Sequence, residues 1–306
     1  MSVRQTVTGP TVAARIGRVI TLPPPSPGFI GEGHSVVHSI GPRDFAHNDP
    51  FILLADDRLD LPRGQQAGAA HPHAGFEIAT LIVDGEMRDR DEGLLRTGDV
   101  VWTTTGSGVV HSEDVEPLGK VRILQLWVTT PSVSRWVAPR FAITARGDAA
   151  VRRGAGVEAR VYSGVSGTVD AGSHLYLPLT MVDISLQPNA VFEQALPASY
   201  GGFLYSLEGE VADDGPRRQR LADGQIGWID HADDALNTTL RLTAGPGGAR
   251  VLLYAGERQG VPIVAKGTFV GETQADLLRV GQTYTQGRMP RLSELARQPS
   301  AASVRS

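Results

Sequence analysis

One pattern occurs twice in this chain, and the repeat constrains the fold more than any other feature. Residues 81–87 (LIVDGEM) resemble residues 205–211 (YSLEGEV), with an offset of 124 residues from Gly85 to Gly209. A Gly-x-x-x-Trp segment follows each time and ends at Trp102 and Trp228, an offset of 126 residues. Self-similarity at a fixed spacing is typical of a duplicated structural unit. We therefore predict two copies of one domain.

The residues between the turns indicate that each copy is built from β-strands. Glycine (36 residues) and proline (20 residues) punctuate the whole chain. Short runs rich in Val, Ile, Leu, Thr and Tyr lie between them, at residues 77–83, 99–104, 121–129, 203–207 and 251–255. Such spacing predicts an all-β protein with sandwich or barrel domains. Together with the repeat, it predicts a duplicated β-barrel.

The helical pattern is confined to the end of the chain. Residues 273–276 (TQAD) look like a capping box before an apolar pair, and residues 291–297 are a second candidate helix. We expect residues 299–306 to be a disordered tail. The 306 residues exceed most single cores. The expected domains are residues 1–145, residues 146–290 and a helical or disordered tail at 291–306.

Composition excludes several classes of protein. Hydrophobic residues make up 41% and charged residues 20%, as in soluble globular proteins. No run approaches the ~18 apolar residues of a membrane helix, and residues 1–9 lack the apolar core of a signal peptide. A net charge of −4 gives no basic footprint for nucleic acid. We therefore predict a cytoplasmic protein that binds neither membrane nor nucleic acid directly.

Two pairs of potential metal ligands are spaced i, i+2, namely His71 with His73 and His111 with Glu113. Because side chains on a strand alternate between faces, both members of a pair would point the same way. Three imidazoles and one carboxylate suit a divalent first-row metal, and Fe(II), Mn, Ni, Cu and Zn are all compatible. The chain has no cysteine, so nitrogen and oxygen must supply the ligands. We predict a mononuclear metal site in a barrel.

Either pair taken alone is more often a polar loop or an exposed strand end, so the repeat serves as an internal control. The offsets carry the histidines and Glu113 to positions in the second copy that hold Ala195, Pro197, Asn237 and Thr239. The scaffold pattern therefore occurs twice and the metal donors once. This favours metal over folding as the reason for the histidines, and it predicts a metal-free second half.

A family resemblance rests on motifs in a specific order. They are residues 71–77 (HPHAGFE), 98–102 (GDVVW), 106–113 (GSGVVHSE), 124–128 (LQLWV), 256–263 (GERQGVPI) and 267–270 (GTFV). Over about residues 14–290 the chain resembles the pirin family of bicupins. The resemblance implies two tandem cupin-type, jelly-roll-like barrels. It also implies the ligands His71, His73, His111 and Glu113, with iron as the usual metal.

The segment after His73 differs from both the general cupin motif and the usual pirin motif. The general cupin motif would nominate Glu77 as a ligand, but the pirin resemblance assigns that role to Glu113. We therefore expect Glu77 to orient an imidazole by accepting its remaining N–H. An arginine commonly follows His-Pro-His in the family and a threonine follows Phe-Glu, whereas Ala74 and Ile78 stand here. The missing arginine would remove positive charge that could bind an anionic substrate or raise the potential of the metal.

Two functions remain open. The first is a metal-dependent dioxygenase similar to the quercetinase activity attributed to some pirins, acting on a flavonol-like aromatic and O2. Glu113 or Glu77 would take the substrate proton. Phe76 and Trp102 would form an apolar wall, although core packing is the commoner role of each aromatic taken singly. The second is a metal- or redox-responsive regulator that binds a protein partner without turnover. A deep cavity would favour the enzyme, and a shallow site under a charged rim would favour the regulator. The charged residues 87–92 are expected to form a solvated hairpin tip.

Overall fold

The computed structural model describes residues 11–62, 68–112, 115–230 and 237–299, which form two compact units. The histidine barrel comprises residues 23–149, 173–178 and 259–306. The apolar barrel comprises residues 1–22, 150–172 and 179–258. Each unit thus contains more than one chain segment, so the compact units cross the expected boundaries at residues 145 and 290. Residues 11–14 and 16–21 pair with strands far along the chain, and such pairings leave no local signal.

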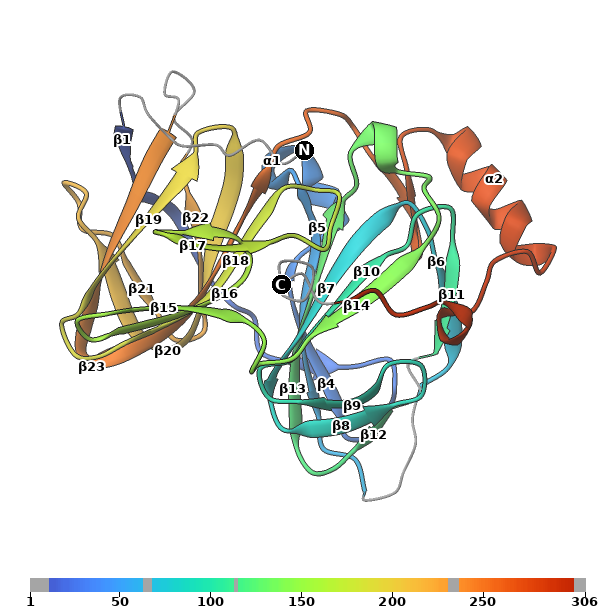
Figure 1. Cartoon of the computed structure of the whole chain (residues 1–306), viewed down its shortest axis with the longest axis horizontal. Coiled ribbons are helices and arrows are strands. Elements are labelled where there is room, and N and C mark those ends of the chain that lie inside the picture. Colours follow the sequence, from blue (N-terminus) through green and yellow to red (C-terminus); the bar gives the residue numbers. More distant parts are fainter. Residues whose placement is uncertain (1–10, 63–67, 113–114, 231–236, 300–306) are drawn as a thin grey trace. The chain divides into compact units, whose positions relative to one another are not determined.

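The main sheet of the histidine barrel has the strand order β14-β10-β7-β13-β5-β4-β3, and smaller sheets pair β11 with β6, β12-β8-β9 and β24 with β25 (Figure 1). The bounds are β3 (Ser26–Pro27), β4 (His34–Ile40), β5 (Phe51–Leu59), β6 (Ala70–His73), β7 (Phe76–Asp84), β8 (Glu86–Asp89), β9 (Gly93–Arg96), β10 (Val100–Thr104), β11 (Val109–Ser112), β12 (Val115–Pro117), β13 (Val121–Thr129), β14 (Arg140–Thr144), β24 (Val264–Lys266) and β25 (Phe269–Gly271).

The apolar barrel has the strand order β15-β16-β18-β23-β20-β22-β2, with β1, β17, β19 and β21 attached to this path. The bounds are β1 (Thr11–Ala14), β2 (Ile16–Thr21), β15 (Ala150–Gly154), β16 (Val157–Ser166), β17 (Val169–Gly172), β18 (Leu179–Leu186), β19 (Val191–Pro197), β20 (Tyr200–Asp213), β21 (Arg220–Ala222), β22 (Gln225–Ile229) and β23 (Asn237–Glu257). The five predicted strand segments lie within or overlap β7, β10, β13, β20 and β23. The all-β prediction is confirmed.

The strand orders of the two barrels match element by element. The central order β10-β7-β13-β5-β4 in one corresponds to β22-β20-β23-β18-β16 in the other. The register preserves both offsets, because Trp102 pairs with Ala79 and Trp228 pairs with Phe203. The predicted duplication is therefore confirmed at the level of individual residue pairs.

The repeated acidic-Gly-Glu turn has one physical cause in both barrels. Gly85 and Gly209 have φ angles of +91° and +69°, in the left-handed region that favours glycine. A Cβ at either position would lie 2.2 Å from a carbonyl oxygen, that of Lys120 in one barrel and Gly248 in the other. Any larger residue would therefore break the approach of the neighbouring strand.

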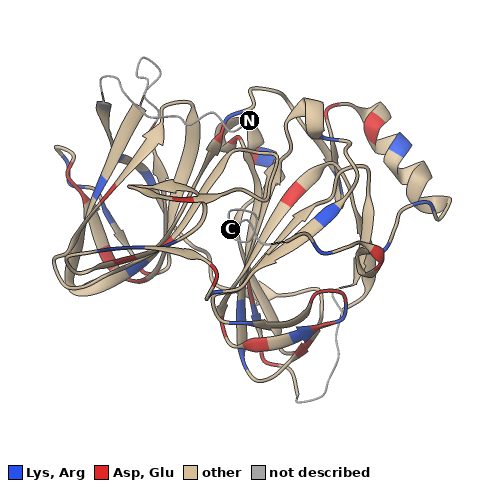
Figure 2. Ribbon diagram, in the orientation of Figure 1, with Lys and Arg blue, Asp and Glu red and all other residues tan. Residues whose placement is uncertain are grey.

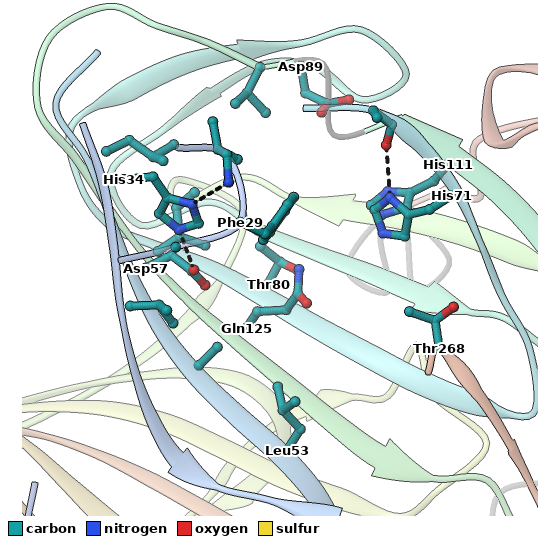
Figure 3. Close-up of a pocket in the computed structure, with 18 of the residues that line it drawn as sticks. Phe29, His34, Leu53, Asp57, His71, Thr80, Asp89, His111, Gln125 and Thr268 are labelled. Atoms are coloured by element: carbon teal, nitrogen blue, oxygen red, sulfur yellow. Dashed lines mark hydrogen bonds and ion pairs between the residues drawn. The ribbon is translucent and has the colours of Figure 1, made fainter. Parts of the chain in front are cut away.

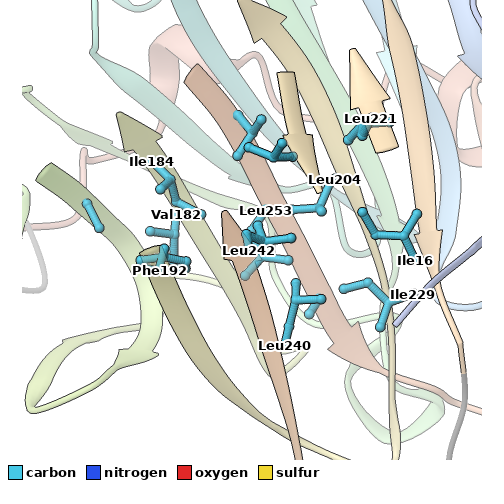
Figure 4. Packing of buried hydrophobic residues seen from close by; sticks show 14 of the residues in the cluster. Ile16, Val182, Ile184, Phe192, Leu204, Leu221, Ile229, Leu240, Leu242 and Leu253 are labelled. Atoms are coloured by element: carbon cyan, nitrogen blue, oxygen red, sulfur yellow. The ribbon is translucent and has the colours of Figure 1, made fainter. Parts of the chain in front are cut away.

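The interior of the apolar barrel is filled by hydrophobic side chains (Figure 4). Leucine, isoleucine, valine and phenylalanine residues from facing strands meet there, and among the labelled ones are Phe192, Leu204, Leu240, Leu242 and Leu253. Each of these five is at most 1% exposed. Alternation along the strands supplies one inward side chain every second residue. The interior of this barrel is therefore packed like an ordinary protein core.

Helices are short. The helices α1 (Phe45–Asn48) and α2 (Gln274–Thr285) and the 3-10 turns Pro42–Asp44, Ser132–Ser134 and Leu292–Glu294 are found in the described residues. The predicted capping box is present, because Thr273 accepts from the backbone of Asp276 and the Asp276 side chain accepts in return. Only the 3-10 turn forms where a helix at 291–297 was expected. Of the predicted tail at 299–306, residues 300–306 lie outside the described residues. None of the described helices has the length and apolar character needed to cross a membrane.

Candidate metal centre

Three histidines converge from two paired strands of the histidine barrel. In the antiparallel β6–β11 pair, His71 lies opposite His111, and His73 lies opposite Val109. The ring centroids are separated by 4.6 Å for His71–His73, 4.7 Å for His71–His111 and 4.8 Å for His73–His111. One nitrogen from each ring lies within 4.8 Å of the others. The spacing rule thus predicted the convergence correctly.

The backbone around β6 is held by residues near the end of the chain. Ala74 donates its N–H to the carbonyl of Thr268 (3.2 Å), and Val270 donates to the carbonyl of Ala74 (2.9 Å). The Thr268 hydroxyl donates to the Pro72 carbonyl, between the first two histidines. Gly75 has φ +86°, and a Cβ there would lie 1.9 Å from the Val270 carbonyl oxygen. These contacts fix the turn that directs His73 inward.

His73 has the environment of a metal donor. It is 2% exposed, and neither ring nitrogen has a hydrogen-bond partner among the described residues. Burial, with His111 and His71 nearby, holds the pKa of His73 well below its usual value. A neutral imidazole with an unused lone pair is the form that binds a metal.

His71 is oriented by the backbone. Its Nδ1 lies 2.9 Å from the carbonyl oxygen of Ala69, which can only accept a hydrogen bond. Nδ1 therefore carries the proton, and Nε2 keeps the lone pair. Fixing the tautomer through the second nitrogen is the usual arrangement in metal sites. The residues present fit a metal ion.

Glu113, the fourth ligand expected from the family resemblance, lies outside the described residues, in the segment 113–114. Its role as a ligand and as a proton acceptor stays a prediction.

Glu77 does not reach the histidines in this structure. It is fully buried, and its Oε1 accepts from the Thr104 hydroxyl (2.7 Å) and the Tyr176 N–H (2.9 Å), while Oε2 accepts from the Leu177 N–H (2.9 Å). Burial raises the pKa of Glu77 despite these bonds. The neighbouring Phe76 contacts His73, so strand alternation directs Glu77 to the other face. The expectation that Glu77 orients an imidazole is therefore corrected: Glu77 anchors residues 176–177.

The histidines lie at one end of a cavity of about 750 Å³ in this barrel. Its aromatic wall is Trp127, whose ring lies 5.4 Å from His73 and stacks on Phe76 at 4.3 Å. The predicted wall was Phe76 and Trp102, but neither is among the residues that line the cavity, and both are buried in packed regions. Trp102 is 1% exposed, and its indole N–H donates to the Thr144 hydroxyl outside the cavity. The alternation of Ile123, Gln125 and Trp127 on β13 could have identified the correct tryptophan.

The charged segment 87–92 belongs to the β8–β9 hairpin, where both signs of charge occur (Figure 2). It is not only a solvated tip, because Met87, Asp89 and Glu92 line the cavity. Asp89 accepts the backbone N–H groups of Asp91 (2.8 Å) and Glu92 (2.9 Å). Burial raises the pKa of Asp89 to about 6. The hairpin thus contributes acidic groups to the cavity wall.

Sequence reasoning missed the far end of the cavity. Phe29, His34, His38 and Asp57 line it, and none of them belongs to a motif identified in the sequence. Phe29 lies beside His34 and His71, with ring separations of 5.4 Å and 6.5 Å. The i, i+4 spacing of His34 and His38 on a strand was the available signal, because it places both on one face.

The two positions that differ from the family motif face packed regions. Ala74 is fully buried against Val280 and Met289, and Ile78 packs with Phe76 and Ile52. No lysine or arginine is found among the described residues that line the cavity.

Solved structures resemble most of the chain. A quercetin 2,3-dioxygenase from Acinetobacter baumannii matches with a TM-score of 0.78 and 23% identity, over 90% of this chain and 98% of that one. A bacterial pirin from Escherichia coli, solved with nickel(II), matches with a TM-score of 0.59 and 15% identity, over 79% and 100%. At these identities the likeness concerns the fold. Fold and site together define a bicupin with a histidine-lined candidate metal centre in one barrel.

Sequence comparisons give the family. The pirin model matches residues 33–128, and the model of the pirin C-terminal cupin domain matches residues 181–290. The chain belongs to the pirin family. A Pseudomonas aeruginosa relative named "Putative quercetin 2,3-dioxygenase" is 29% identical over 88% of this chain and 96% of its own length. The predicted bicupin fold is confirmed.

Proposed function

We propose that this protein is a metal-dependent dioxygenase that acts on flavonol-like aromatic substrates. The observation that carries the proposal is the convergence of three histidines at one end of a cavity of about 750 Å³. This volume is within the range of small-molecule sites. The names of the Pseudomonas relative and the Acinetobacter neighbour support the same substrate class.

His71, His73 and His111 would hold the metal, with Glu113 as the fourth ligand implied by the family, and Fe(II) is the metal we propose. The nickel-bound E. coli neighbour supports metal binding by this fold. When bound, the metal would supply Lewis acidity that stabilises a deprotonated enol and a template that brings it beside O2.

The protein's own residues would place the substrate and move its proton. Trp127, backed by Phe76, offers a flat apolar surface next to His73, which suits a planar aromatic ring. Glu113 is the proposed acceptor of the substrate hydroxyl proton. Glu77 has no part in this proposal, because its carboxylate binds Thr104 and residues 176–177.

The depth of the cavity favours a small-molecule substrate over a regulator that offers a shallow charged rim to a protein. His73 is buried at 2% exposure, so a protein surface could not reach it without a side chain that enters the cavity.

The test is O2 uptake with quercetin after anaerobic loading with Fe(II). We expect uptake by the loaded wild type and loss of it in His73→Ala and Glu113→Ala. His47→Ala is the matched control, because His47 is exposed on α1. Stoichiometric metal binding without uptake would contradict quercetin as a substrate and favour the regulator. Failure to bind metal would contradict the site itself.

A further inference from the structure

A row of four side chains, three of them polar, crosses the floor of the cavity. In the register of the main sheet, Thr80 lies opposite Gln125, Gln125 opposite Ala55, and Ala55 opposite His38. All four line the cavity. The Gln125 Oε1 accepts the Trp127 indole N–H at 2.8 Å, which fixes the orientation of the amide. The polar row therefore lies directly beside Trp127, which forms the aromatic wall of the cavity.

The apolar barrel shows that the fold does not require these polar residues. The matching strand register assigns to each polar residue a counterpart in the other barrel, and all these counterparts are hydrophobic. The counterparts of Thr80, Gln125, His38, Asp57 and His34 are Leu204, Leu253, Val161, Ile184 and Val157, respectively. The first four are fully buried in the core. A role in ligand binding explains the polar set better than folding does.

His34 and Asp57 form a second polar end, opposite the histidine cluster (Figure 3). The Ile30 N–H donates to His34 Nδ1 at 3.2 Å, so the proton of the neutral ring is on Nε2. Nε2 lies 2.8 Å from Asp57 Oδ1. This chain of bonds fixes the Asp57 carboxylate, whose side chain is 18% exposed, in the cavity wall. A fixed carboxylate is an acceptor for a donor group on a ligand.

The two ends are separated by the length of a small aromatic molecule. On β13, Ile123 lies opposite Asp57 and is four residues from Trp127, or about 13 Å at ~3.3 Å per residue. Figure 3 shows Phe29, Thr80 and Gln125 between His34 and His71. Phe29 contacts the rings of both histidines and is 70% exposed, so it lies at the cavity's open side.

The charge of the lining selects against anions. Asp57, Asp89 and Glu92 line the cavity, and none of the described lining residues is a lysine or arginine. A carboxylate or sulfate on the far part of a ligand would therefore meet like charge there. A neutral hydroxyl can donate to the same groups.

We propose that Asp57, held by His34, is a specificity-determining residue that accepts a hydrogen bond from an outer-ring hydroxyl of a neutral, polyhydroxylated aromatic. The inference deepens the proposed function, on which it rests for the class of ligand. It explains why one barrel has polar groups at positions that the other fills with leucine, isoleucine and valine.

The experiment is calorimetric titration under nitrogen with Zn(II)-loaded and metal-free protein, so that binding is measured without turnover. The probes are quercetin, 3-hydroxyflavone, which lacks the outer hydroxyls, and quercetin 3′-sulfate. We expect the wild type to bind quercetin about tenfold more tightly than either analogue, because neither analogue can make the same hydrogen bond to the charged Asp57 carboxylate. In Asp57→Val both ratios should fall to near one.

Asp60→Val is the matched control, because Asp60 follows the same strand with its side chain 65% exposed. If circular dichroism shows that Asp57→Val is unfolded, the isosteric Asp57→Asn decides by the sulfate ratio. Unchanged ratios in the Asp57 variant, or sulfate binding as tight as quercetin binding, would overturn the inference. Selective binding without O2 uptake would refute the proposed function alone, and uptake with unchanged ratios would refute this inference alone.

Discussion

The histidine barrel and the apolar barrel share a strand order and a register, yet their interiors differ. One surrounds a cavity lined by histidines and carboxylates, and the other is filled by leucine, isoleucine, valine and phenylalanine. Because apolar burial is the main favourable term in folding, the histidine barrel forgoes stability that its counterpart retains. The difference separates what the fold needs from what a ligand needs, within a single chain.

The strongest test of this comparison is a reciprocal swap. Leu253→Gln places an amide in the packed barrel, and we expect a loss of about 3 to 5 kcal/mol in the free energy of unfolding, from lost apolar burial and an unsatisfied polar group. Gln125→Leu, at the corresponding position of the histidine barrel, should cost only about 1 kcal/mol, because the Trp127 N–H loses its acceptor beside an open cavity. Urea unfolding measures both. Equal costs would refute the distinction between the interiors.

The second prediction is that metal binds in the histidine barrel and depends on its three histidines. His73→Ala is expected to weaken Zn(II) affinity at least 100-fold in a competitive chelator titration, since one of three convergent imidazoles is removed. His47→Ala should leave affinity unchanged. Wild-type affinity in the His73 variant would mean that the metal binds elsewhere.

The duplicated turn predicts equal sensitivity in both barrels. Gly85→Ala and Gly209→Ala should each destabilise the protein by about 2 to 4 kcal/mol, because both combine positive φ with a close carbonyl oxygen. Gly93→Ala, with φ +88° and no heavy atom within 4 Å of the added carbon, should cost less. Thermal unfolding gives the order. If Gly93→Ala costs as much as the other two, the close approach is not the cause.

Glu77→Gln should destabilise the protein less than the two turn substitutions do and should leave metal affinity intact. An amide offers one oxygen where the carboxylate offers two, so a loss of about 1 to 3 kcal/mol is expected. Since the pKa of Glu77 is raised in the folded state, folding takes up a proton between the usual and the raised pKa. Wild-type stability relative to the glutamine variant should therefore fall as pH rises through that window. Glu32→Gln, at an exposed position, is the control. Weakened metal binding in Glu77→Gln would instead support the original expectation that Glu77 orients an imidazole.

Local patterns predicted much of this molecule. Strand alternation predicted that His71, His73 and His111 converge, and the structure shows this. The offsets of 124 and 126 residues between the two copies also appear in the register of the paired strands. Contacts between distant segments could not be predicted. The pairing of β2 with β22, and the anchoring of residues 176–177 by Glu77, join residues about 100 or more apart in the chain. Neither leaves a periodic signal, because a partner's identity does not alter the local pattern.

The cavity could be predicted only in part for the same reason. Trp127 was available from alternation on β13, but Phe29 reaches the site from the loop between β3 and β4. His34 and Asp57 become neighbours only through the pairing of β4 with β5. Sequence spacing identifies metal ligands that lie on one strand or in two motifs with the same spacing. The residues on the opposite wall of the cavity depend on which strands pair in the folded sheet.

The most direct test of the account is anomalous X-ray diffraction from crystals of the metal-loaded chain, recorded at the absorption edge of the metal. The account predicts one strong peak per chain, about 2.1 Å from nitrogens of His71, His73 and His111, and none inside the apolar barrel. A peak in the apolar barrel, or none at the three histidines, would contradict it.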